Sequence, residues 1–94
     1  MRVTLVLPRT LRAEAGGAGK VELDLAGEPT LAAVLDAVGR EYPGLERRLR
    51  DETRALRRYV NFYLDGQECR ALGGADSPMR EGAEIRVVAS VAGG

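Results

Sequence analysis

The stretch PTLAAVLDAVGREYPG, residues 29–44, decides the fold, because it places one amphipathic helix between two β-hairpins. Thr30 predicts the start of this helix, since a threonine hydroxyl accepts a hydrogen bond from an unpaired amide of the first turn. Apolar residues then recur at spacings of three and four and form one stripe, made of Leu31, Val34, Leu35 and Val38. Pro43 and Gly44 end the helix near Tyr42, and a weaker helical segment is expected over residues 45–49.

Alternating apolar and polar residues on either side of this helix predict strands, because successive strand side chains point to opposite faces. The predicted strands are Arg2–Leu7, Lys20–Leu25, Tyr59–Leu64, a short one around Gln67–Arg70, and Glu84–Val88. Asp65-Gly66 is a typical reverse-turn pair. A single amphipathic helix covers one face of a sheet, so this order predicts an α+β fold of the β-grasp (ubiquitin-like) kind. We expect a mixed four- to five-stranded sheet packed on one long helix.

The composition favours no charged partner. Fourteen basic and fourteen acidic residues leave a formal net charge of zero among 94 residues, so we expect neither nucleic acid nor a membrane as partner. The apolar opening Val3–Leu7 is too short for a signal-peptide core and far shorter than a membrane span. A cytoplasmic location is therefore expected.

The residue types present exclude several kinds of site. The chain has no histidine, which removes the commonest general base and the usual nitrogen ligand of zinc, so no metal site is expected. The single cysteine, Cys69, cannot form an internal disulfide, and a small buried hydrophobe is favoured over a persulfide acceptor. The arginines between Arg47 and Arg58 alternate with acids, which favours a solvated surface over a nucleic-acid patch.

The last six residues differ from everything before them. Residues 89–94, ASVAGG, are small and follow the last predicted strand directly. We therefore expect a β-grasp domain over residues 1–88 and a flexible C-terminal tail over residues 89–94 that ends in Gly-Gly.

The ββαββ order and the closing segment EGAEIRVVASVAGG, residues 81–94, resemble the MoaD/ThiS-type ubiquitin-like sulfur carriers. This is the family of the small subunit of molybdopterin synthase and of the thiamine sulfur carrier. Three segments are most similar to the carriers that deliver sulfur to O-phosphoserine in cysteine biosynthesis: LPRTLR at 7–12, RYVNFYLDGQECR at 58–70 and SVAGG at 90–94.

The resemblance implies a mechanism in which the chain is a protein cosubstrate and not an enzyme. An adenylating enzyme of the MoeB/ThiF type, using ATP and Mg²⁺, would activate the carboxylate of Gly94, and sulfur would convert it to a thiocarboxylate. Val91, Ala92 and Gly93 would thread into the active sites of the partners. A sulfur-accepting synthase, such as a cysteine-synthase-like enzyme, would take the sulfur, and the chain itself would bind no cofactor.

A docking surface is expected on the sheet face that points away from the helix. Alternation places Val6, Tyr63, Arg86 and Val88 on that face, while Leu5, Phe62, Leu64, Ile85 and Val87 point to the core. Apolar residues beside an arginine are typical of contact surfaces.

Two other functions fit the same residues. A ubiquitin-like modifier would be conjugated through Gly94 to a lysine of a target after the same activation step. A non-covalent β-grasp subunit would make no chemical use of the terminus.

Overall fold

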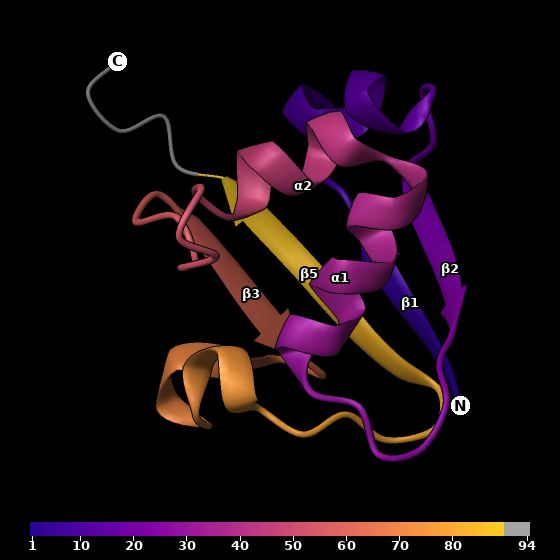
Figure 1. Cartoon of the computed structure of the whole chain (residues 1–94), viewed down its shortest axis with the longest axis vertical. Helices are drawn as coiled ribbons and strands as arrows, with labels where there is room; N and C mark the ends of the chain where they lie inside the picture. The colour runs from indigo at the N-terminus through magenta and orange to yellow at the C-terminus, as the bar shows by residue number, and fades with distance from the viewer. Residues whose placement is uncertain (90–94) are drawn as a thin grey trace.

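Five strands form one mixed sheet in the order β2-β1-β5-β3-β4, in a computed structural model that describes residues 1–89 (Figure 1). The strands are β1 Arg2–Val6, β2 Lys20–Asp24, β3 Val60–Leu64, β4 Gln67–Glu68 and β5 Ala83–Ala89. The first and last strands, β1 and β5, pair in parallel at the centre, and the other neighbours pair antiparallel. This mixed sheet confirms the predicted β-grasp architecture.

The two α-helices lie on one side of the sheet (Figure 1). They are α1 Leu31–Glu41 and α2 Pro43–Leu49, and three short 3-10 helices complete the fold: η1 Arg9–Ala15, η2 Cys69–Ala71 and η3 Gly74–Asp76. The predicted cap of α1 is confirmed, because Thr30 Oγ1 accepts a hydrogen bond of 3.3 Å from the amide of Ala33. Pro43 ends α1 and also begins α2, where its missing N–H has no helical partner to lose. No helix among residues 1–89 is both long and apolar enough to cross a membrane.

The connection between β1 and β2 contains structure that the sequence pattern did not predict. Between the first two predicted strands the sequence pattern indicates no helix, but Arg9–Ala15 wind into η1. Leu11 and Ala15 of η1 are 6% and 3% exposed, so the connection contributes to the core. Gly16 then reverses the chain with a φ of 66°, a conformation that favours glycine.

The core lies between the sheet and α1. All four residues of the predicted helix stripe are fully buried, and the five strand residues predicted to face them are at most 9% exposed. Burying one such aliphatic or aromatic side chain contributes about 1.5–3 kcal/mol, so this layer supplies much of the stability of a small domain. The predicted alternation of faces along β3 and β5 is therefore confirmed.

Arg50 corrects the prediction that the arginine-rich stretch is solvated throughout. Its side chain is 3% exposed and reaches back from the end of α2 to two carboxylates. The Arg50 guanidinium lies 2.8 Å from Asp36 on α1 and 2.9 Å from Glu46 on α2. Two partners make this buried charge tolerable, because they replace the water that it has lost. The ion pairs tie both helices to the segment that leads to β3.

Candidate functional site

The predicted reactive residues of the tail lie outside the described residues. Gly94, and the threading residues Val91, Ala92 and Gly93, follow Ala89, the last described residue. The structure therefore shows the body that carries this segment, and the prediction for these four residues stays a prediction, as does the boundary between domain and tail. The last strand runs one residue further at each end than predicted, from Ala83 to Ala89.

The end of β5 has a well-defined place in the molecule. β5 is a central strand, hydrogen-bonded to β1 on one side and to β3 on the other, and Ala89 still pairs with Val60 of β3. Successive strand residues point to opposite faces. Val88 accordingly faces the open side of the sheet and is 40% exposed, whereas Ala89 packs against the edge of the core.

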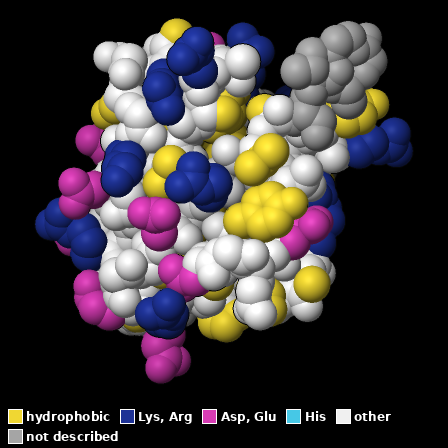
Figure 2. Space-filling model, turned by 180° about the vertical axis from the view of Figure 1, so that it is seen from behind, with side chains coloured by type: hydrophobic (Ala, Val, Ile, Leu, Met, Phe, Trp, Pro, Cys, Tyr) yellow, Lys and Arg dark blue, Asp and Glu magenta, His cyan; other side chains and the backbone are white. Residues whose placement is uncertain are grey.

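Three of the four predicted docking residues form a contiguous patch on the open face of the sheet. We call Tyr63, Arg86 and Val88 the outer-face patch. Tyr63 lies directly opposite Arg86 in the pairing of β3 with β5, and Val88 follows two residues later on the same face. Together with the β3–β4 turn they line a shallow hollow of about 390 Å³. Figure 2, seen from the side opposite the helices, shows hydrophobic side chains gathered on this face among charged ones.

Val6, the fourth predicted docking residue, lies in the same cross-strand row but offers little surface. It stands opposite Arg86 on one side and Lys20 on the other. Its side chain is only 8% exposed and does not belong to the core cluster. Alternation placed Val6 on the correct face, yet the longer side chains of its neighbours decide how much of it a partner could touch.

The arginines on the open face are matched by nearby acids. Arg2 pairs with Glu22 at 2.7 Å and with Asp24 at 3.0 Å. Arg86 lies 3.9 Å from Glu84, two residues away on the same strand. All of these groups are largely exposed, so each pair stabilises the fold little, but local charge on this face nearly cancels.

Comparison of the sequence with known protein families identifies one that spans nearly the whole chain. The model of the ThiS family matches residues 5–94 of the chain. The chain belongs to the ThiS family. The family resemblance drawn from the sequence is thereby confirmed.

Curated relatives of this ThiS-family chain include the sulfur carrier protein CysO of Mycobacterium tuberculosis, which is 33% identical over the full length of both chains. The crystal structure of that protein superimposes with a TM-score of 0.81, at 31% identity, over 95% of this chain and 99% of the other. CysO in the Amycolatopsis orientalis BexX/CysO complex gives a TM-score of 0.83 at 30% identity, covering 98% and 99% of the two chains. SAMP1 from Haloferax volcanii, at 24% identity and complete coverage of both chains, shares the fold with a TM-score of 0.84.

Cys69 does not offer an accessible thiol in this ThiS-family fold. It is 1% exposed, and burial raises the pKa of the thiol above its ordinary value, although a hydrogen bond with Ser77 opposes the shift. A protonated, buried thiol is a poor nucleophile, which supports the structural role expected from the sequence. Among residues 1–89, no three Cys, Asp or Glu side chains come together as a metal site.

Proposed function

We propose that this chain is a sulfur carrier whose Gly94 carboxylate is activated with ATP and converted to a thiocarboxylate. The observation that carries the proposal is the 33% identity to a sulfur carrier protein over the whole length of both chains. The ThiS-family match, which includes the Gly-Gly segment, supports the same function. In this function the chain is a protein cosubstrate, and the catalysts are its partners.

The proposed activation answers a chemical difficulty. An α-carboxyl group titrates near pH ~3.5, so at neutral pH Gly94 carries an anion that resists nucleophilic attack. In a MoeB/ThiF-like partner, a carboxylate oxygen of Gly94 attacks the α-phosphorus of Mg²⁺-bound ATP and pyrophosphate leaves. A sulfur nucleophile then attacks the carbonyl carbon, and the bond to AMP breaks as the C–S bond forms.

Glycine suits positions 93 and 94 for steric reasons. Without a Cβ atom, Gly93 passes through a narrow channel in conformations closed to other residues, and nothing at Gly94 shields the carbonyl from attack. A short segment of this kind provides little area for binding. The folded body therefore has to supply most of the affinity for the activating enzyme.

The outer-face patch is the surface we assign to that enzyme. Val88, one residue before the end of β5, and Tyr63, opposite Arg86 on β3, supply apolar area, and Arg86 supplies directed hydrogen bonds. The patch lies beside the point where the chain continues into residues 90–94. A partner that binds here is close to the carboxylate on which it acts.

The thiocarboxylate would donate its sulfur in biosynthesis, with cysteine as the favoured product and a cysteine-synthase-like enzyme as the favoured acceptor. The similarity to CysO proteins supports this choice. The A. orientalis CysO was solved in complex with BexX, which shows that a relative of 30% identity binds a protein partner stably enough to crystallise.

Intact mass spectrometry tests the proposal. The chain is incubated with the adenylating enzyme of its own genome, ATP, Mg²⁺ and sulfide. We expect the mass gain of one oxygen replaced by sulfur, and none in a variant that lacks Gly94. A larger adduct that has lost water, joined to a lysine, would indicate a protein modifier instead. An unchanged mass would contradict both and favour a non-covalent subunit.

A further inference from the structure

A second hollow flanks the end of β5 on the opposite side of the sheet from the outer-face patch. We call it the strand-end hollow. It encloses about 640 Å³, and its lining includes Leu11, Arg47, Arg48, Arg57, Tyr59 and Ala89. These residues come from η1, α2, the segment before β3 and the end of β5. Sequence reasoning grouped its arginines with the solvated surface and did not single out Tyr59.

Three arginines and no acidic residue line the strand-end hollow. Arg47 and Arg57 form no ion pair with any acid among residues 1–89, and both are exposed. Arg48 approaches Glu14 at 3.6 Å, but both side chains are substantially exposed, so the pair is weak. Since the chain as a whole has no net charge, this local excess is a property of the fold.

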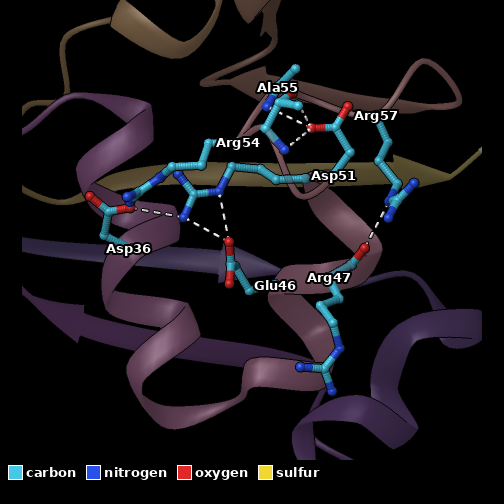
Figure 3. Close-up of polar contacts among 9 residues, drawn as sticks. Asp36, Glu46, Arg47, Asp51, Arg54, Ala55 and Arg57 are labelled. Carbon is cyan, nitrogen blue, oxygen red and sulfur yellow. Dashed lines mark hydrogen bonds and ion pairs between the residues drawn. The ribbon is translucent and has the colours of Figure 1, made fainter.

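Hydrogen bonds hold Arg57, one of the arginines of the hollow, in place. Arg57 Nε donates to the carbonyl oxygen of Arg47 at 2.7 Å, as Figure 3 shows, and the amide of Arg57 donates to the carbonyl of Leu49 at 3.0 Å. Asp51 accepts hydrogen bonds from the amides of Thr53 and Ala55 and closes the turn before Arg57. A guanidinium group held in this way loses less conformational entropy on binding.

The chemistry of the hollow selects an acidic protein segment as its occupant. Guanidinium groups bind carboxylates with two parallel hydrogen bonds, and they keep their charge at every physiological pH. Tyr59, which is 50% exposed beside them, adds a rigid aromatic surface. Tyrosine and arginine are among the residues most enriched where protein partners bind tightly.

The position of the hollow limits which partner can reach it. Residues 90–94 follow Ala89, and five residues span at most roughly 18 Å, so any enzyme that holds Gly94 in its active site lies near the hollow. The outer-face patch, assigned above to activation, lies on the other side of the same strand. A carrier has to pass from the activating enzyme to an acceptor, and a second surface beside the same strand end gives the acceptor contacts of its own.

We infer that the strand-end hollow docks an acidic segment of the enzyme that receives the sulfur, an inference that rests on the proposed function. Arg47 and Arg57 bind carboxylates of that enzyme, and Tyr59 packs against the same segment. The hollow acts in recognition only, since its side chains belong to the body of the carrier and the transferred sulfur is on Gly94.

A binding experiment with a chemically prepared carrier tests this inference without the activation step. Thiolysis of an intein fusion produces the Gly94 thiocarboxylate directly, and calorimetry measures its affinity for the cysteine-synthase-like enzyme of the same genome. We expect Arg47→Glu to weaken binding about tenfold and to reduce its dependence on salt, and Arg47→Gln to have a smaller effect of the same sign. Arg40→Glu is the matched control, because Arg40 is exposed, forms no ion pair within residues 1–89 and does not line the hollow.

Three outcomes would overturn the inference. One is equal binding by the Arg47→Glu and Arg40→Glu variants, with urea unfolding showing that both are folded. Another is that Arg47→Glu slows adenylation as strongly as it weakens binding to the acceptor enzyme, because the hollow would then serve the activating enzyme. The third is no binding by the wild-type thiocarboxylate. Failure of the proposed function is recognised separately, as an unchanged mass in the activation assay.

Discussion

The outer-face patch and the strand-end hollow lie on opposite sides of the sheet, yet they meet at consecutive residues of β5, Val88 and Ala89. On the open face, Arg2 and Arg86 are matched by neighbouring acids. Around the hollow, Arg47 and Arg57 form no ion pair among residues 1–89, and no acid lines the hollow with them. The difference shows that a chain of zero net charge can still present one neutralised surface and one cationic surface, because the fold decides which charges become neighbours.

The two surfaces should differ most in what supports them. The outer-face patch rests on sheet pairing, whereas the strand-end hollow is built on α2 and the segment after it, which the ion pairs of Arg50 link to α1. Arg50→Ala should lower the free energy of unfolding by about 2–3 kcal/mol, because it removes the buried partner of two carboxylates that are themselves only partly buried. Urea unfolding measures this effect.

Arg54→Ala is the matched control for that variant. Arg54 also pairs with Asp36, but its side chain is 64% exposed, so its loss should cost less than about 1 kcal/mol. Equal costs for the two variants would show that burial of Arg50 does not strengthen its ion pairs.

Loss of the outer-face patch should impair activation. Val88→Asp places a charge within the apolar part of the patch and should lower kcat/KM for adenylation by about tenfold or more, and Tyr63→Asp should act in the same direction. Pyrophosphate exchange with the adenylating enzyme measures the rate. Leu72→Asp is the control, because Leu72 is 38% exposed, close to the 40% of Val88, and lies after η2 away from the patch. An equal loss in this control would mean that the patch is misassigned.

Salt should separate the two surfaces further. Raising NaCl from about 0.05 to 0.5 M shortens the screening length severalfold, so it should weaken acceptor binding at the hollow several-fold. Adenylation through the outer-face patch should change less, because its contacts are mainly apolar. Titrations of both reactions over this range provide the measurement, and equal salt slopes would contradict the contrast between the surfaces.

The smallest expected effect is a pH dependence of stability. Burial opposes the charge of Asp36, but hydrogen bonds and ion pairs from Arg50 and Arg54 outweigh it and hold the pKa of this carboxyl below its ordinary value of 3.8. A depressed pKa stabilises the folded state above the unfolded pKa, and this contribution is lost as pH falls below about 4. The free energy of unfolding, measured in urea at several acid pH values, should therefore fall less steeply with decreasing pH in Asp36→Asn than in the wild type. Glu41→Gln changes an exposed residue of the same helix and should leave the pH dependence of the free energy of unfolding as it is in the wild type.

Much of the fold could be predicted from local patterns. The stripe of α1, the cap at Thr30 and the alternation of β3 and β5 all appear in the structure as expected. Local patterns failed where neighbours from distant segments decide exposure. Val6 stands on the predicted face but is 8% exposed between Arg86 and Lys20, and Arg50 looked solvated but is buried against Asp36, which is 14 residues away.

By itself, the sequence determined the order of strands and helix, the faces of those elements and the family to which the chain belongs, because each depends on periodicity or on a contiguous motif. Only the tertiary structure decided which charges pair and which stay unbalanced, and that Tyr59, Arg47 and Arg57 share a hollow beside Ala89. The physical reason is that ion pairing and burial depend on distances between residues far apart in the chain, which no local pattern records.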